Sequence, residues 1–339
     1  MDIGLAIAVR NLPGKPQHLP SLYREFLAEA QLAEQLGFDA VWVSEHHFAE
    51  DNWNSATLPM LAAVAARTER VRLGTYVLLL ALHDPLRVAE DLTGIDLISN
   101  GRLEIAVGAG PMEVECKVFG IDKNEAFGRT YEALEFMQRC FSEDGPFTHE
   151  GKYYHYPNVN MRPRPVQQPH PPIWMAAMGP QSIQRAAQRG YHLASALHSP
   201  LWKTYAGQLE AAGRKRADQR VMSGPLLVHL APTREQAWDE AEQGMHWCVD
   251  FYNRRGWTAP LPPVGELRRT PDAGIYGIPF AVGTPEDVVR ILGRYREEPL
   301  DQICLQFRAP GMDYACVERS LRMFAAEVMP EMRRWGAQG

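Results

Sequence analysis

The chain has 339 residues, of which 45% are hydrophobic and 22% are charged. These fractions are ordinary for a globular protein with a large buried core, and the length suits either two average domains or one α/β barrel. The formal net charge of −6 gives no electrostatic reason to expect nucleic acid or an anionic membrane as a partner.

The N-terminal segment MDIGLAIAV has no cationic start and no cleavage site, so it is predicted to be a strand and not a signal peptide. The longest apolar run, Val77–Leu82, is too short to span a bilayer. Five cysteines without a CxxC spacing predict reduced, mostly structural thiols, at Cys116, Cys140, Cys248, Cys304 and Cys316. We therefore expect a cytoplasmic protein without a membrane segment.

Apolar runs of strand length alternate with helical patterns along the chain. Eight strands are predicted, at Ile3–Val9, Asp39–Val43, Val71–Leu80, Leu103–Gly108, Pro171–Ala177, Tyr191–Ala196, Pro225–Leu230 and Gln302–Phe307. The first helix is expected to follow an N-cap at Ser21 and to stop at Gly37. Further helices are predicted at residues 58–67, 85–98, 124–141, 181–189, 234–252, 285–297 and 317–329, and a hairpin at 147–159.

The alternation of strand and helix determines the predicted fold class. Eight such units favour a closed (β/α)₈ TIM barrel in the α/β class, with an open doubly wound sheet as the alternative. No GxGxxG follows the first strand, so the dinucleotide-binding signature of such an open sheet is absent. We expect residues 1–339 to form one barrel domain with insertions, in which the weakly periodic segment Trp257–Pro279 is a long loop or lid.

Polar residues gather where the predicted strands end, which is where the active site of such a barrel is assembled. They lie at Ser44–Phe48, His83–Asp84, Gly108–Gly110, Met178–Ser182 and His198. The cluster Glu45-His46-His47 is the strongest catalytic candidate, because histidine exchanges protons near neutral pH and a carboxylate can orient it. The structural alternative is a polar loop in which one histidine caps a helix.

The same cluster has the residue types of a zinc or iron site. Adjacent residues of an extended chain point in opposite directions, however, and no HExxH or HxH completes a ligand set, so no metal site is assigned. A second feature is the turn at residues 177–182, where a glycine precedes a predicted helix. The free N–H groups at a helix N-terminus bind phosphate.

A series of motifs then follows in a characteristic order. FDAVWVSEHHF at Phe38–Phe48 comes first, followed by motifs at Gly74-Thr75, His83–Arg87, Ala89–Asp91, Ser99–Arg102, Val118–Gly120, Pro172–Trp174, Ala186–Gly190, Val282–Asp287 and Val328–Pro330. Together they resemble the bacterial luciferase-like, flavin-dependent monooxygenase superfamily over nearly the whole chain. The order in which these motifs follow one another is strongly specific for this superfamily, but it says little about which substrate is used.

The resemblance implies an FMN-type flavin at the C-terminal mouth of the barrel. It implies that His46 is the catalytic base with Glu45 as its neighbour, and that the non-proline peptide between Tyr76 and Val77 is cis behind the flavin ring. Gly108 would face this ring. The other implied cofactor contacts are Ala109 and, at the flavin phosphate, Met178, Gly179 and Ser182.

Ala109 departs from the family, because it stands where luciferase has a phosphate-binding arginine. The phosphate would then rely on the helix N-terminus with Ser182, or on another cation such as Arg162 or Arg164, and luminescence is in doubt. An apolar wall that keeps water from the flavin is expected from Leu78, Leu80, Trp174 and Met178.

The resemblance also implies an activity. Reduced FMN from a partner NAD(P)H-dependent flavin reductase would react with O₂ to form a flavin hydroperoxide, which inserts one oxygen atom into a small organic substrate. The alternatives are a deazaflavin-dependent oxidoreductase, a non-catalytic flavin-binding protein and a metal hydrolase. Substrate contacts are expected from the loops Asn52–Ser55, Met112–Glu115 and Trp257–Tyr276, and a homodimer is implied, for which Leu58–Ala66 offers a small-residue face.

Overall fold

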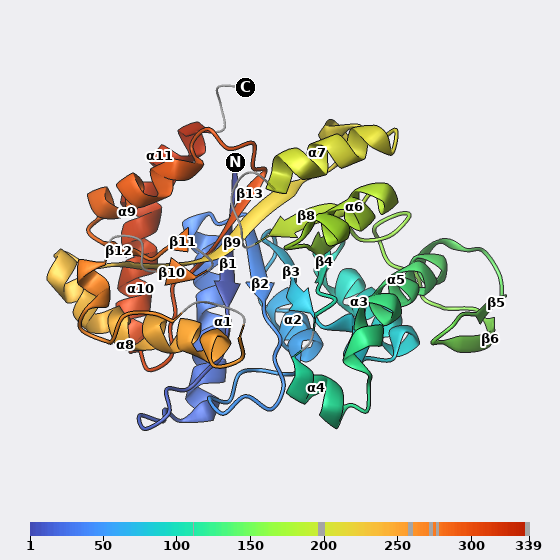
Figure 1. Ribbon diagram of the computed structural model, residues 1–339, viewed down its shortest axis with the longest axis horizontal. Helices are drawn as coiled ribbons and strands as arrows, with labels where there is room; N and C mark the ends of the chain where they lie inside the picture. Colours follow the sequence, from blue (N-terminus) through green and yellow to red (C-terminus); the bar gives the residue numbers. More distant parts are fainter. Residues whose placement is uncertain (111, 196–200, 257–259, 271–273, 276–277, 336–339) are drawn as a thin grey trace.

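The computed structural model describes residues 1–110, 112–195, 201–256, 260–270, 274–275 and 278–335. Eight parallel strands form a closed barrel, in the order β9-β13-β1-β2-β3-β4-β7-β8, and the pairing of β8 with β9 closes it (Figure 1). Their bounds are β1 Asp2–Ile7, β2 Ala40–Val43, β3 Arg72–Leu78, β4 Leu103–Val107, β7 Ile173–Ala176, β8 His192–Ser195, β9 Val221–Leu230 and β13 Gln302–Gln306. The barrel and all eight predicted strands are confirmed.

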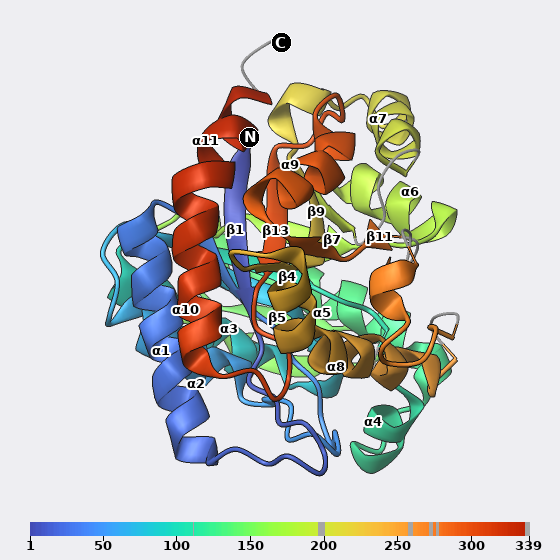
Figure 2. The same ribbon diagram turned by 90° about the vertical axis from the view of Figure 1, so that its left-hand side faces the viewer.

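Helices surround the barrel, as the two views show (Figures 1 and 2). They are α1 Leu19–Leu36, α2 Thr57–Ala65, α3 Pro85–Ser99, α4 Glu113–Val118, α5 Ala126–Ser142, α6 Pro180–Arg189, α7 Leu201–Ala211, α8 Arg234–Asn253, α9 Pro285–Leu292, α10 Tyr314–Met323 and α11 Met329–Trp335. Helix α1 starts two residues before the predicted cap, with His18 as N-cap, because Pro20 suits the first turn of a helix. None of the described helices is both long and apolar enough to cross a bilayer.

Five short strands complete the described set. The predicted hairpin at residues 147–159 is confirmed by β5 Phe147–Glu150 and β6 His155–Val159. Strand β12 Ala281–Gly283 extends the barrel sheet beside the end of β9. Within the predicted lid, β10 Gly274–Ile275 pairs with β11 Ile278–Pro279, and the Glu242 carboxylate on α8 accepts from the Gly265 N–H and pairs with Arg268. A lid role for this segment stays a prediction.

Small residues and two tryptophans fill the barrel interior. The indoles of Trp42 and Trp174 meet edge to face at 6.1 Å, among Ala6, Ala40, Ala106, Ala194, Met222 and Cys304. Gly74 provides the room for Trp42, since a Cβ there would lie 2.5 Å from the indole and 2.6 Å from the Glu104 carbonyl oxygen. The interior is therefore a packed core, and a ligand has to bind at one end of the barrel.

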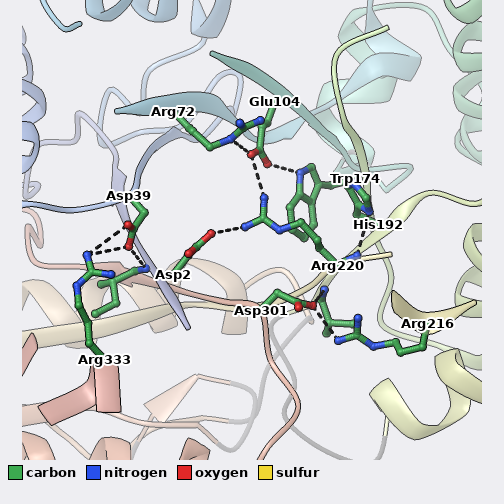
Figure 3. Close-up of polar contacts among 12 residues, drawn as sticks. Asp2, Asp39, Arg72, Glu104, Trp174, His192, Arg216, Arg220, Asp301 and Arg333 are labelled. Carbon is green, nitrogen blue, oxygen red and sulfur yellow. Dashed lines mark hydrogen bonds and ion pairs between the residues drawn. The ribbon is translucent and has the colours of Figure 1, made fainter. Parts of the chain in front are cut away.

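Charged residues close the N-terminal end of the barrel (Figure 3). The buried Glu104 carboxylate accepts from Arg72, from Arg220 at 3.2 Å and from the Trp174 indole at 2.5 Å. Burial lowers the pKa of His192 to about 4, and its Nδ1 accepts from the backbone N–H of Arg220. Each arginine of this network is paired with a carboxylate. This end of the barrel therefore stabilises the fold, and a ligand is expected at the opposite, C-terminal end.

Candidate functional site

A cavity of about 860 Å³ opens at the C-terminal ends of the strands. All nine residues predicted for catalysis or cofactor binding line it, namely Glu45, His46, Tyr76, Val77, Gly108, Ala109, Met178, Gly179 and Ser182. The volume falls in the upper part of the range that small-molecule and cofactor sites occupy. The barrel therefore brings the predicted site residues to one place, while their individual roles stay predictions.

His46 lies between two hydrogen-bonding partners at the end of β2. Its Nδ1 is 3.1 Å from Oε1 of Glu115 on α4, and its Nε2 is 3.1 Å from the hydroxyl of Tyr252 on α8. The Trp53 ring packs edge-on against the imidazole with the centroids 4.4 Å apart. Both ring nitrogens are thus engaged, and the ring orientation is held by residues from three different segments.

Glu115 is the carboxylate that orients His46. Its side chain is fully buried and also accepts from the backbone N–H groups of His47 at 2.8 Å and Met112 at 2.6 Å. Burial alone would raise the pKa of Glu115, but these hydrogen bonds and the one with His46 outweigh it and lower the pKa. The carboxylate is therefore ionised at neutral pH and stabilises a proton on Nδ1 of His46.

Glu45 does not contact His46, contrary to the expectation for the Glu-His-His cluster. Its Oε1 lies 2.7 Å from Nε2 of His47 and 2.7 Å from Nε2 of His83. Strand β2 ends at Val43 and the chain bends at His47 and Phe48, which brings the His47 ring back to the Glu45 carboxylate. Burial would raise the pKa of Glu45, but the hydrogen bonds from the two histidines lower it.

Glu45, His47 and His83 also have the composition of a metal-ligand set. Their ligand atoms all lie within 4.8 Å of one another. A carboxylate with two imidazoles is a common set for zinc or iron. The two short hydrogen bonds through Oε1 of Glu45 account for the arrangement by themselves, so we assign it to the support of the loop after β2.

One wall of the cavity is formed by β3 and β4. The peptide between Tyr76 and Val77 is cis, as predicted. Gly108 keeps the adjacent space open, because a Cβ at this position would meet Cγ2 of Val77 at 2.6 Å. The predicted apolar wall is only partly right: Met178 lines the cavity, whereas Leu78, Leu80 and Trp174 are fully buried in the core and do not.

The N-terminus of α6 faces the same cavity. Gly179 is the N-cap, and the Ser182 hydroxyl donates to the Gly179 carbonyl oxygen at 2.8 Å. The N–H groups in the first turn of a helix have no intrahelical partner, so those of Gln181 and Ser182 are available to an anion. Because the hydroxyl proton of Ser182 is already donated, the backbone is the stronger donor here.

Arg162 and Arg164, the possible substitutes for the missing cation at Ala109, do not line the cavity. Arg162 lies at a separate, smaller cavity beside Arg87 and Glu90, and Arg164 pairs with Asp144 at 3.2 Å. The alternative is therefore wrong, because neither Arg162 nor Arg164 lines the cavity at the C-terminal mouth. The predicted candidate His198 lies outside the described residues.

Glu115 and Tyr252, the two partners of His46, were not predicted from the sequence. They are 69 and 206 positions away from it along the chain. The segment Met112–Glu115, expected to be a substrate loop, instead starts helix α4. The sequence held one indication of Glu115: it is an acidic residue that follows strand β4, at the end of the barrel where active-site residues gather.

Comparisons with known proteins agree with this geometry. A family model described as luciferase-like monooxygenase matches residues 1–302. The uncharacterized protein y4wF of Sinorhizobium fredii is 37% identical over 282 residues, 81% of this chain and 82% of that protein. The oxygenase component of the flavin-dependent trigonelline monooxygenase of Acinetobacter baylyi is 29% identical over 329 residues, 91% of this chain and 89% of that protein. An F420-dependent glucose-6-phosphate dehydrogenase of Amycolatopsis mediterranei is 25% identical over 330 residues, 92% and 96% of the two chains.

Solved structures show the same architecture. Monooxygenase RslO1 from Streptomyces bottropensis matches with a TM-score of 0.82 and 28% identity, covering 98% of this chain and 99% of its own. The oxygenating constituent of 3,6-diketocamphane monooxygenase from Pseudomonas putida, solved in complex with FMN, matches with a TM-score of 0.78 and 20% identity over 98% of both chains. At that identity the second match bears on the fold alone, and it agrees with the predicted barrel.

Proposed function

The chain belongs to the luciferase-like monooxygenase family, and from this premise we propose that it is the oxygenase component of a two-component monooxygenase. Its co-substrates would be O₂ and reduced FMN, the latter delivered by a separate NAD(P)H-dependent reductase. A small organic molecule would receive one oxygen atom. A relative supports this proposal, since the trigonelline protein of Acinetobacter baylyi is the oxygenase component of a flavin-dependent monooxygenase.

The residues of the cavity fit a flavin mononucleotide. The Tyr76-Val77 backbone would support the ring system, and Gly108 leaves the space beside Val77 that any side chain would fill. The first turn of α6 would hold the phosphate through the N–H groups of Gln181 and Ser182. When bound, reduced FMN supplies the electrons that activate O₂.

The observation that carries the proposal is that His46, which lines this same cavity, is paired with the buried Glu115 behind it. Ionised Glu115 holds a proton on Nδ1, which leaves Nε2 as the atom that accepts or returns a proton. The Tyr252 hydroxyl, 3.1 Å from Nε2, donates to it in the resting protein and fixes the ring until the substrate arrives. Trp53 beside the imidazole limits the access of water.

Anaerobic titration tests the proposal directly. The protein is titrated with reduced FMN and, separately, with a reduced deazaflavin, and binding is followed by absorbance. Admission of air with a panel of small substrates then shows whether oxygen uptake is coupled to product or released as H₂O₂. Tight binding of reduced FMN with substrate-dependent coupling is expected. Binding of the deazaflavin alone, with substrate oxidation or reduction in the absence of oxygen, would contradict the proposal.

A deazaflavin-dependent oxidoreductase is the second candidate, favoured by the match to the F420-dependent dehydrogenase over almost the whole chain. It would transfer a hydride and would not consume oxygen. A non-catalytic flavin-binding protein would bind oxidised flavin and show no oxygen uptake with any substrate. We also propose a homodimer, which the resemblance implies, and analytical ultracentrifugation of the full chain measures it.

A further inference from the structure

Two arginines line the cavity, and they differ in how their charge is balanced. The guanidinium of Arg10 is buried and pairs with the Asp51 carboxylate at 2.6 Å. Arg185 on α6 is exposed, and within the described part of the chain it forms no ion pair. Its guanidinium lies over the Tyr131 ring, whose centroid is 5.8 Å from the guanidinium carbon. Arg185 is thus the cavity cation whose charge is free for a ligand.

The position of Arg185 directs that charge toward the anion-binding end of its helix. It follows Ser182 by three residues and Gln181 by four, and residues at these spacings lie on one face of a helix. Side chains of a helix tilt toward its N-terminus, so Arg185 extends back over the first turn. Consistent with this, Gln181, Ser182 and Arg185 all line the same cavity.

We propose that Arg185 is the cation that binds the terminal phosphate of FMN, taking the place of the arginine that Ala109 lacks. The inference rests on the proposed function and names a residue that acts in it. The phosphate would meet the N–H groups of the first turn of α6 on one side and the guanidinium on the other. Arginine suits this task because its planar fork donates two parallel hydrogen bonds to a phosphate.

The electrostatics of α6 support this assignment over its other arginine. Arg189 lies one turn further along the helix and pairs with Glu135 at 3.1 Å, outside the cavity. A phosphomonoester carries about 1.5 to 2 negative charges at neutral pH, and the dipole of α6 alone offers roughly half a positive charge. A free guanidinium supplies the missing compensation without displacing an existing ion pair.

FMN and riboflavin differ only in the phosphate, so they isolate its contribution to binding. Anaerobic calorimetry measures the affinity of the full-length protein for each flavin in its reduced form. Arg185→Gln is expected to weaken FMN binding at least about tenfold, since a charge-assisted hydrogen bond contributes that much or more. Riboflavin binding should stay within about twofold of the wild type, because its chain ends before the phosphate.

Arg189→Gln is the matched control, with the same substitution on the same helix, and it should leave the affinity for both flavins unchanged. The inference is overturned if the Arg185→Gln variant binds FMN as tightly as the wild type does. It is also overturned if the variant loses affinity for riboflavin as much as for FMN. These outcomes leave the proposed function intact. Wild-type protein that binds no reduced FMN contradicts the proposed function itself, which separates the two failures.

Discussion

The Nδ1 atom of His46 lies 3.1 Å from a carboxylate oxygen of Glu115, and that carboxylate is fully buried. The two residues come from the loop after β2 and from helix α4. A buried carboxylate beside an imidazole selects the tautomer and holds the ring, and loss of such an outer partner typically reduces activity 10–100-fold. This pair therefore gives the first test of the site.

Glu115→Gln should lower coupled oxygenation roughly 10–100-fold while the affinity for reduced FMN stays near that of the wild type. The amide oxygen can still accept from Nδ1 of His46, but without the negative charge of the carboxylate it stabilises a positive charge on the imidazole less during proton transfer. Glu113→Gln is the control, because the Glu113 side chain is on the same helix and 84% exposed. Steady-state kinetics with single-turnover oxygenation measures the effect. Equal rates for the two variants would remove Glu115 from the mechanism.

His46→Ala should lose at least about tenfold in coupled oxygenation, which corresponds to about 1.4 kcal/mol of barrier. His46 lines the cavity, whereas His47 does not line it and bonds to Glu45. His47→Ala serves as the comparison and should retain more activity. Product formation per reduced FMN consumed is the measurement. Full activity in His46→Ala, or a comparable loss in His47→Ala, would show that the wrong histidine has been assigned.

The Glu45–His83 contact should make stability depend on pH. Burial alone would lower the pKa of His83, but its hydrogen bond with Glu45 raises the pKa above the ordinary 6.5. Protonated His83 therefore stabilises the folded protein fully below pH 6.5, and this contribution is lost as pH rises through the raised pKa. At the acidic end, Glu45 has a lowered pKa, so its contribution is present above pH 4.5 and lost as pH falls through that pKa.

His83→Gln should consequently reduce the free energy of unfolding more at about pH 6 than at about pH 9. Urea unfolding at a series of pH values gives both numbers. His155→Gln is the control, since the His155 side chain is 61% exposed and pairs only with the exposed Glu150 among the described residues. A destabilisation by His83→Gln that does not change with pH contradicts the contact as described.

Gly108→Ala should lower the free energy of unfolding by about 1–3 kcal/mol, the usual cost of overpacking. The new Cβ would lie 2.6 Å from Cγ2 of Val77, and a β-branched side chain has little freedom to move aside. Gly110→Ala is the control two residues away, where a Cβ meets nothing within 4 Å. Thermal and urea unfolding measure both variants. If they unfold alike, Gly108 does not provide the tight space inferred here.

The order of elements and the barrel class follow from the sequence because hydrophobic periodicity is a local property. Residues such as Ile3–Val9 and Gln302–Phe307 show the pattern of a buried strand without reference to any partner. Eight repeats of strand and helix then leave the closed barrel as the favoured arrangement. The rule that strand ends carry the site placed His46, Gly108 and Ser182 together, and all three line one cavity.

The partners of those residues were decided by the tertiary structure alone. Glu45 is adjacent to His46 in sequence, yet its carboxylate bonds to His47 and His83, and the carboxylate that meets His46 is Glu115. Likewise, nothing in the sequence separates Arg185 from Arg162 or Arg164 as a free cation. Sequence proximity says little about side-chain contact, because contact depends on which segments the fold brings together at the mouth of the barrel.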